Sequence, residues 1–324
     1  MDSTGDWEIP AHMQPRQEEA GFDLEAALSS VVLVRAEVPD DAFTASALGT
    51  ERLGSGVVVE RDGIVLTIGY LITEAQTIWL TTGDGRVVAG HALAYDQHTG
   101  FGLVQALGRP GVPPLPRGSA DRCSVGSSVV LASQGGRRHA LSTRVVAKRE
   151  FAGYWEYLLD EAIFTVPAHP HWSGGAVIGH DGRLIGIGSL LVQEKIGGKE
   201  VAGNMAVPID LLEPILGDLL TRGQANRPAR PWLGVYATEA SGHIIAAGVA
   251  PGGPADRAGI ERGDIILEIA GEPVSHLADL YRALWALGGP KVEVPLSLAR
   301  GRKIWSAAVQ AGDRNSFLKK PGLH

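Results

Sequence analysis

Residues 165–188 read TVPAHPHWSGGAVIGHDGRLIGIG, and this stretch bears on both the fold and the chemistry of the chain. The pair Asp181-Gly182 is a strong signal for a tight hairpin between two strands, and Asp-Gly recurs at Asp62-Gly63 and Asp84-Gly85. Upstream, Ser173-Gly174-Gly175 is the setting expected of a nucleophilic serine, although histidines and prolines crowd the positions just before it. The stretch therefore predicts strands joined by tight turns, and it raises the question of whether Ser173 is a working nucleophile.

The composition favours a chain built mainly of short strands. Its 324 residues include 43 glycines and 19 prolines, and a hydrophobic fraction of 44% is enough for two cores. The formal net charge of -7 and the absence of a long basic stripe argue against binding to nucleic acid. No apolar run approaches the ~18 residues that a membrane-spanning helix needs.

The N-terminus and the cysteine content together predict a cytoplasmic location. Residues 1–22 have neither a charged segment before an apolar core nor a small-residue cleavage site, so we expect a flexible acidic arm rather than a secretory signal. Cys123 is the single cysteine, which rules out a disulfide within the chain. The first observation favours the cytoplasm, and the second is compatible with it.

The remaining pattern indicates two domains. The proline-rich loop at residues 113–116 divides a strand-rich region into halves of similar content, as expected of two packed barrels. A later helix is expected at about residues 276–287, behind a Ser275 cap. The predicted segments are the arm (1–22), the two-barrel domain (23–222), a linker (223–231), a smaller domain (232–312) and a tail (313–324).

The order of the motifs resembles the HtrA/Deg family of serine proteases, in which a trypsin-like double barrel precedes a PDZ domain. The resemblance covers about residues 24–310. It implies a mainly β fold, with a trypsin-like double β-barrel followed by a PDZ domain. The matching segments are GSGVVVERDGIVLT (54–67), AYDQHTGFGLV (94–104), SGGAVIGHDGRLIGIG (173–188), NMAVPIDLLEPIL (204–216), WLGV (232–235) and VAPGGPADRAGIERGDIILEIAGEPV (249–274).

The same resemblance implies that two of the three catalytic positions have lost their chemistry. Tyr70 stands where the family has its general-base histidine, and Gly100 stands where it has the orienting aspartate, while Ser173 remains. A phenol with a pKa near ~10 is protonated at neutral pH and lacks a second ring nitrogen. His171, next to Trp172, holds the position of the glycine whose N–H helps to stabilise the oxyanion. Since loss of the base alone costs on the order of 10⁶ in turnover in well-studied proteases, the resemblance predicts a remnant site.

Two alternatives for the same residues stay open. His169, His171 or His98 could reach Ser173 from an unusual direction, because a catalytic triad is recognised by geometry, and the chain would then be a serine endopeptidase with a non-standard site. His169 and His171 could also bind a metal with help from His98 or His180, but zinc needs three or four ligands. We therefore predict no metal and no cofactor.

The second domain is expected to bind peptides. By resemblance, Trp232, Leu233, Gly234 and Val235 form the loop whose backbone N–H groups receive a C-terminal carboxylate, and the peptide adds as a strand. A neighbouring segment of the same assembly could instead fill this groove.

The predicted function is that of an inactive HtrA-like pseudoprotease, a scaffold or accessory subunit. Its partner would be a protein C-terminus or extended peptide, and homo-oligomers are possible. Tyr70 is expected to fill the space of the lost histidine, and Trp172 to present an apolar anchor. A chaperone-like binder of unfolded peptides is a further alternative.

Overall fold

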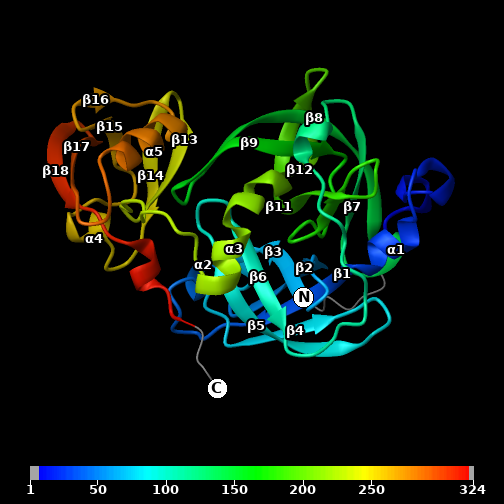
Figure 1. Cartoon of the computed structure of the whole chain (residues 1–324). Coiled ribbons are helices and arrows are strands. Elements are labelled where there is room, and N and C mark those ends of the chain that lie inside the picture. The colour runs from blue at the N-terminus through cyan, green and yellow to red at the C-terminus, as the bar shows by residue number, and fades with distance from the viewer. Residues whose placement is uncertain (1–6, 321–324) are drawn as a thin grey trace. The chain divides into compact units, whose positions relative to one another are not determined.

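The computed structural model describes residues 7–320, and the chain divides into two compact units. Of the described residues, the first unit contains 7–149, 161–226 and 320, and the second contains 150–160 and 227–319. The boundary between residues 226 and 227 falls within the segment that the sequence suggests as a linker. In Figure 1 most of the second unit is coloured from yellow to red.

Six strands of the first unit close into a barrel in the order β1-β2-β3-β6-β5-β4 (Figure 1). The predicted turn at Asp62-Gly63 joins β2 to β3, where Val57 pairs with Leu66 and Gly63 has a φ of +87° that suits glycine. The five residues of β3 are all buried, so both faces of this strand are covered. The strands are β1 (Val31–Glu37), β2 (Glu51–Val58), β3 (Ile64–Ile68), β4 (Thr77–Thr81), β5 (Val87–Tyr95) and β6 (Phe101–Ala106).

A second closed barrel follows in the order β10-β11-β12-β9-β8-β7. The turn at Asp181-Gly182 joins β10 to β11, where Ala176 pairs with Ile187. Buried aliphatic side chains such as Leu131 and Ile163 fill its core. The strands are β7 (Ser128–Ala132), β8 (Ala140–Gly153), β9 (Tyr157–Val166), β10 (Ala176–Ile178), β11 (Leu184–Ile196) and β12 (Lys199–Pro208).

Residues 7–22 of the expected arm pack on the first unit, while residues 1–6 lie outside the described residues. The Ile9 side chain is only 4% exposed, and its N–H donates to the Arg138 carbonyl at 2.8 Å. The helices of this unit are α1 (Leu24–Ser29), α2 (Ala45–Leu48), α3 (Glu213–Arg222) and the short 3-10 helices η1 (Ala11–Met13), η2 (Gln17–Glu19), η3 (Gly69–Leu71), η4 (Ala120–Arg122), η5 (Gly136–His139) and η6 (Ile209–Leu211).

The second unit is a sheet in the order β13-β14-β15-β17-β18, with β16 paired to β15. Helix α5 buries Leu277, Leu280, Tyr281 and Leu284 against the core of this unit. The elements are β13 (Val235–Ala240), β14 (His243–Val249), α4 (Pro254–Arg257), β15 (Ile265–Ile269), β16 (Glu272–Pro273), α5 (Leu277–Ala286), β17 (Glu293–Arg300), β18 (Lys303–Gln310) and η7 (Arg314–Phe317). The predicted fold class, mainly β with two barrels and a smaller second domain, is confirmed.

The predicted Ser275 cap of the long helix is wrong. The N-cap residue of α5 is His276, and its side chain makes no capping hydrogen bond. Instead, the Leu277 N–H donates to Glu239 Oε1 at 2.7 Å. A carboxylate on β13 therefore takes the place of a local cap, which sequence spacing alone does not show. Among the described residues, the helices are all too short or too polar to cross a bilayer.

Candidate functional site

Ser173 lies in the loop between β9 and β10, where the two barrels of the first unit meet. Its carbonyl accepts a hydrogen bond from the Ser55 N–H of β2 at 2.7 Å, and the Gly174 N–H donates to the Gly188 carbonyl of β11 at 2.9 Å. Gly174 has a φ of +72°, and a Cβ there would lie 1.9 Å from the Ser55 carbonyl oxygen. The loop is therefore fixed to both barrels, and only glycine fits after the serine.

The Tyr70 hydroxyl is the side-chain partner of Ser173. Tyr70 lies in η3, directly after β3, and its Oη is 2.8 Å from Ser173 Oγ. The same Oη donates to the Ser189 carbonyl at 2.7 Å. Because a phenol has one proton, Ser173 is the donor to Tyr70.

The protonation of Tyr70 suits this arrangement. Burial raises the pKa of Tyr70 to about 12, against the opposing effect of its hydrogen bonds to Ser173 and Trp172. The phenol is thus neutral at physiological pH, and a neutral phenol is no base for a serine proton. The half-buried Trp172 also turns its polar edge inward, since its Nε1 donates to the Ser189 carbonyl at 3.2 Å.

Gly100 contributes no carboxylate and has a backbone that disfavours one. Its φ is +82°, a left-handed conformation that an aspartate adopts at a cost. The Gly100 carbonyl accepts from the Gly69 N–H at 2.7 Å, which fixes the turn against η3. The nearby Asp96 is engaged within its own turn, where Oδ2 accepts from the Thr99 N–H at 2.8 Å and from Thr99 Oγ1 at 2.7 Å.

His169 is fully buried and uses both ring nitrogens. Nε2 lies 3.0 Å from the His139 carbonyl, and Nδ1 accepts from the His171 N–H at 3.0 Å, so we assign the ring proton to Nε2. Burial lowers the pKa of His169 to about 4, although the contact with the His139 carbonyl favours the charged form. His169 is therefore a neutral ring that holds the loop.

The hydrogen bond to His169 Nδ1 also engages the His171 N–H, which the family resemblance places in the oxyanion site. The His171 amide points at His169 Nδ1 rather than at a position beside Ser173. The exposed His171 ring stacks on Trp7, with ring centroids 4.0 Å apart, and burial together with the charge of His139 lowers its pKa. The rings of His169 and His171 are thus engaged away from Ser173 Oγ, and a role for His98 as its base stays a prediction.

The rings around His169 and His171 include two residues that sequence reasoning missed, Trp7 and His139. The Trp7 ring contacts His139, His169 and His171 at centroid distances of 4.4, 5.7 and 4.0 Å. His139 comes from η5 and Trp7 from the N-terminal segment, so no local spacing connects them to the serine loop. Among the described residues, no group of three or more side chains is arranged to hold a metal ion.

The loop that the sequence assigns to peptide binding is already occupied by a carboxylate. The N–H groups of Leu233, Gly234 and Val235 all donate to Glu156, at 3.1, 2.7 and 3.1 Å for the shortest contact of each. Trp232 makes a different contact, because its N–H donates to the Gly312 carbonyl at 3.0 Å and its ring packs on Phe317. Sequence reasoning missed Glu156, since no motif marks it.

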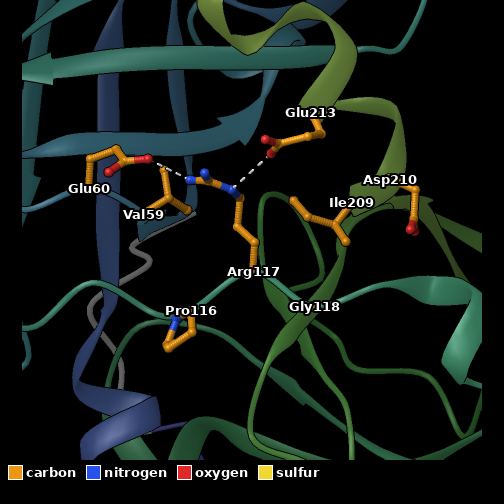
Figure 2. Close-up of a pocket in the computed structure, with 8 residues that line it drawn as sticks. All are labelled: Val59, Glu60, Pro116, Arg117, Gly118, Ile209, Asp210 and Glu213. Atoms are coloured by element: carbon orange, nitrogen blue, oxygen red, sulfur yellow. Dashed lines mark hydrogen bonds and ion pairs between the residues drawn. The ribbon is translucent and has the colours of Figure 1, made fainter.

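A separate pocket in the first unit holds a closed charge cluster (Figure 2). Arg117 lies between two carboxylates, 2.6 Å from Glu60 and 3.6 Å from Glu213, as the dashed lines in Figure 2 show. The Asp210 carboxylate accepts from the Ala120 N–H at 2.7 Å. These groups are already paired, and the lining includes none of the residues that contact Ser173.

Two closed barrels with a Ser-Gly-Gly turn at their junction define a trypsin-like peptidase fold. Residues 54–187 match the family model of the trypsin-like peptidase domain, and residues 245–294 match that of the PDZ domain. The chain therefore combines a trypsin-like peptidase domain with one PDZ domain, and its homologues include HtrA-type proteases of the DegP and DegQ kinds.

Curated relatives and solved structures agree on this architecture. The periplasmic pH-dependent serine endoprotease DegQ of Escherichia coli is 28% identical over 311 residues, which cover 86% of this chain and 67% of DegQ. A DegP-like periplasmic serine endoprotease of Halomonas elongata is 25% identical over 283 residues, 83% of this chain and 58% of that protein. The chain thus spans about three-fifths of the length of such DegP-like relatives, with shares of 58% and 60%.

Two structures show the same fold over nearly the whole chain. The HtrA-type protease AlgW with a tripeptide has a TM-score of 0.51 and 20% identity, and covers 93% of this chain and 99% of its own. A serine endoprotease from Yersinia pestis has a TM-score of 0.51 and 23% identity, covering 91% and 99%.

The predicted cytoplasmic location is contradicted by these comparisons. The relatives from Halomonas elongata, Pseudomonas fluorescens and Escherichia coli are all named periplasmic. The prediction depended on the first 22 residues and on a single cysteine, and neither determines the compartment: one cysteine is compatible with an oxidising environment as well as a reducing one.

Proposed function

We propose that this chain is an HtrA-type protein whose peptidase domain does not cleave peptide bonds and which acts as a peptide-binding scaffold. The observation that carries the proposal is the hydrogen bond between Ser173 Oγ and Tyr70 Oη at 2.8 Å. A working serine must pass its proton to a base, and a neutral phenol does not take it. Gly100 adds no orienting carboxylate, and the His171 N–H is engaged by His169.

The proposed partner is a protein C-terminus or an extended segment that adds to the PDZ sheet. Backbone N–H groups of Leu233, Gly234 and Val235 form a site for one carboxylate, and β13 beside them can pair with an added strand. We place this function in the periplasm, in line with the names of the curated relatives.

The test compares the native chain with Ser173→Ala. Both are treated with a serine-reactive fluorophosphonate and with casein as an unfolded substrate. We expect neither chain to be labelled and neither to degrade casein above background. Labelling or degradation that disappears in Ser173→Ala would establish a working nucleophile and end the scaffold proposal.

A serine endopeptidase with a non-standard site is the second candidate. It is favoured by the retained Ser173 at the junction of the barrels and by relatives that are named serine endoproteases. In that case the fluorophosphonate would label the native chain, and Ser173→Ala would be neither labelled nor active on casein.

Protection of unfolded casein from aggregation by both chains, without cleavage, would instead identify a chaperone-like binder.

A further inference from the structure

The end of the β8–β9 hairpin, residues 150–160, belongs to the second unit and lies against β13 and α5. Glu156, near its tip, is buried to 7% exposure, and its carboxylate accepts from three successive backbone N–H groups. The shortest of these runs from Gly234 at 2.7 Å. Three donors converging on one carboxylate form a complete anion site, because charge-assisted hydrogen bonds of this kind are short and strong.

The backbone of the same segment pairs with the sheet. The Ala237 N–H of β13 donates to the Tyr154 carbonyl at 2.9 Å, two residues before Glu156. In addition, the Tyr281 hydroxyl of α5 donates to the Gly153 carbonyl at 2.8 Å. The turn thus makes main-chain contacts with one strand and one helix of the second unit.

Apolar and charged side chains complete the docking. Leu158 is 8% exposed and belongs to the same buried cluster as Leu233 and Leu284. At the rim, Arg282 of α5 pairs with Glu150 at 2.5 Å and with Asp160 at 2.8 Å, so both ends of the segment are tied to the helix. Arg282 and Glu150 are about half exposed and Asp160 is 91% exposed, so these rim pairs contribute little to the affinity, whereas Leu158 adds buried apolar surface.

We propose that residues 150–160 are an internal ligand of the PDZ groove, in which the Glu156 side chain takes the place of a peptide's C-terminal carboxylate. An external chain and the hairpin end then need the same three N–H groups, so their binding is mutually exclusive. The inference deepens the proposed peptide binding and rests on it. The partner is a chain with a free C-terminal carboxylate that displaces Glu156.

The backbone conformation of Glu156 is the kind expected in a segment that is held in place by its contacts. Its φ is +58°, a left-handed conformation that is strained for a residue with a Cβ and persists where the surroundings impose it. Because the hairpin is covalently attached, it competes at a high effective concentration. The apparent affinity for an external peptide falls by the fraction of molecules whose groove is open.

The first experiment measures amide hydrogen exchange of Leu233, Gly234 and Val235 in the full chain by NMR. Glu156→Ala is compared with Glu161→Ala, a matched loss of a glutamate five residues further along, in β9, whose carboxylate pairs with Lys148 instead. We expect exchange of the three amides to be about tenfold or more faster in Glu156→Ala only, since they lose a charged acceptor. Glu156→Gln, which keeps the shape and loses the charge, provides a second variant with a smaller acceleration. Unchanged exchange in both Glu156 variants would overturn the internal-ligand proposal.

The second experiment measures binding of a fluorescein-labelled pool of ten-residue peptides that end in Val, Leu, Ile or Phe. The pool is used with free C-terminal carboxylates and, separately, with amidated ends. We expect Glu156→Ala to bind the carboxylate pool about tenfold more tightly than Glu161→Ala does, and the amidated pool no better. Faster amide exchange without any gain in peptide binding would leave the internal ligand in place and overturn the proposed peptide-binding function.

Discussion

Tyr70 is the hydrogen-bond partner of Ser173, and in the proposed function it also leaves this serine without a base. Its hydroxyl accepts from Ser173 and donates to the Ser189 carbonyl, and the residue is held in η3 by the neighbouring Gly69–Gly100 contact. A satisfied hydrogen bond between two partly buried hydroxyls contributes about 1 kcal/mol to stability. The pair is therefore expected to act as a structural contact.

A double-mutant cycle tests this role. We expect Tyr70→Phe to lower the free energy of unfolding by about 1 to 2 kcal/mol, because the Ser189 carbonyl keeps only the Trp172 donor and Ser173 loses its acceptor. Urea unfolding of Tyr70→Phe, Ser173→Ala and the double variant should give a coupling of about 0.5 to 1 kcal/mol between the two sites. Strictly additive effects would contradict a direct contact.

At the scale of elements, glycines set the serine turn. Gly174 joins the two barrels through its φ of +72° and its close approach to the Ser55 carbonyl. Gly217 differs, because it lies inside α3 and a Cβ added there would meet no atom within 4 Å, so the space around it is open. The same substitution is therefore expected to act in opposite directions at these two positions.

The expected results follow from this geometry. Gly174→Ala should destabilise the first unit by about 3 kcal/mol or more, through overlap with the backbone and a left-handed φ. Gly217→Ala should stabilise it by up to about 1 kcal/mol, since alanine is the better helix former. Thermal unfolding followed by circular dichroism measures both, and a Gly174→Ala variant as stable as the wild type would refute the proposed restraint on the turn.

At the scale of the whole molecule, the sequence predicts what is local or repeated in a pattern. Asp-Gly turns, buried strands and motif order predict both barrels and the PDZ sheet. Motif order also pointed to Tyr70 and Ser173. It did not point to Glu156 or Trp7, because their partners lie far along the chain: Glu156 contacts Gly234, and Trp7 contacts His139. The α5 cap was missed for the same reason, since Glu239 is on another element.

Two buried groups, His169 and Glu156, give the chain opposite responses to pH. Burial lowers the pKa of His169 from 6.5 to about 4, next to the charges of His139 and His171, so the folded state binds fewer protons than the unfolded state between these values. His169 therefore contributes stability above pH 6.5 that is lost as the pH falls towards 4. With 1.36 kcal/mol per pH unit, the loss is about 3 kcal/mol.

Glu156 has the reverse sign. Burial raises its pKa from 4.5 to about 7, against the three backbone hydrogen bonds and the charge of Arg314, with Tyr236 and Tyr281 also nearby. The folded state then binds more protons than the unfolded state between pH 4.5 and 7. Its contribution is present below pH 4.5 and falls by about 3 kcal/mol as the pH rises to 7.

Since the two contributions oppose each other between pH 4.5 and 6.5, they should partly cancel in the wild type, and single variants should separate them. Relative to the wild type, His169→Gln should lose the term that rises with pH, so its unfolding free energy falls more steeply as the pH increases. Glu156→Gln should lose the falling term, and its stability should increase more steeply over the same range. Urea unfolding of the three chains at half-unit steps from pH 4 to 8 measures this. Profiles that differ only by a constant offset would show that neither group changes its pKa on folding.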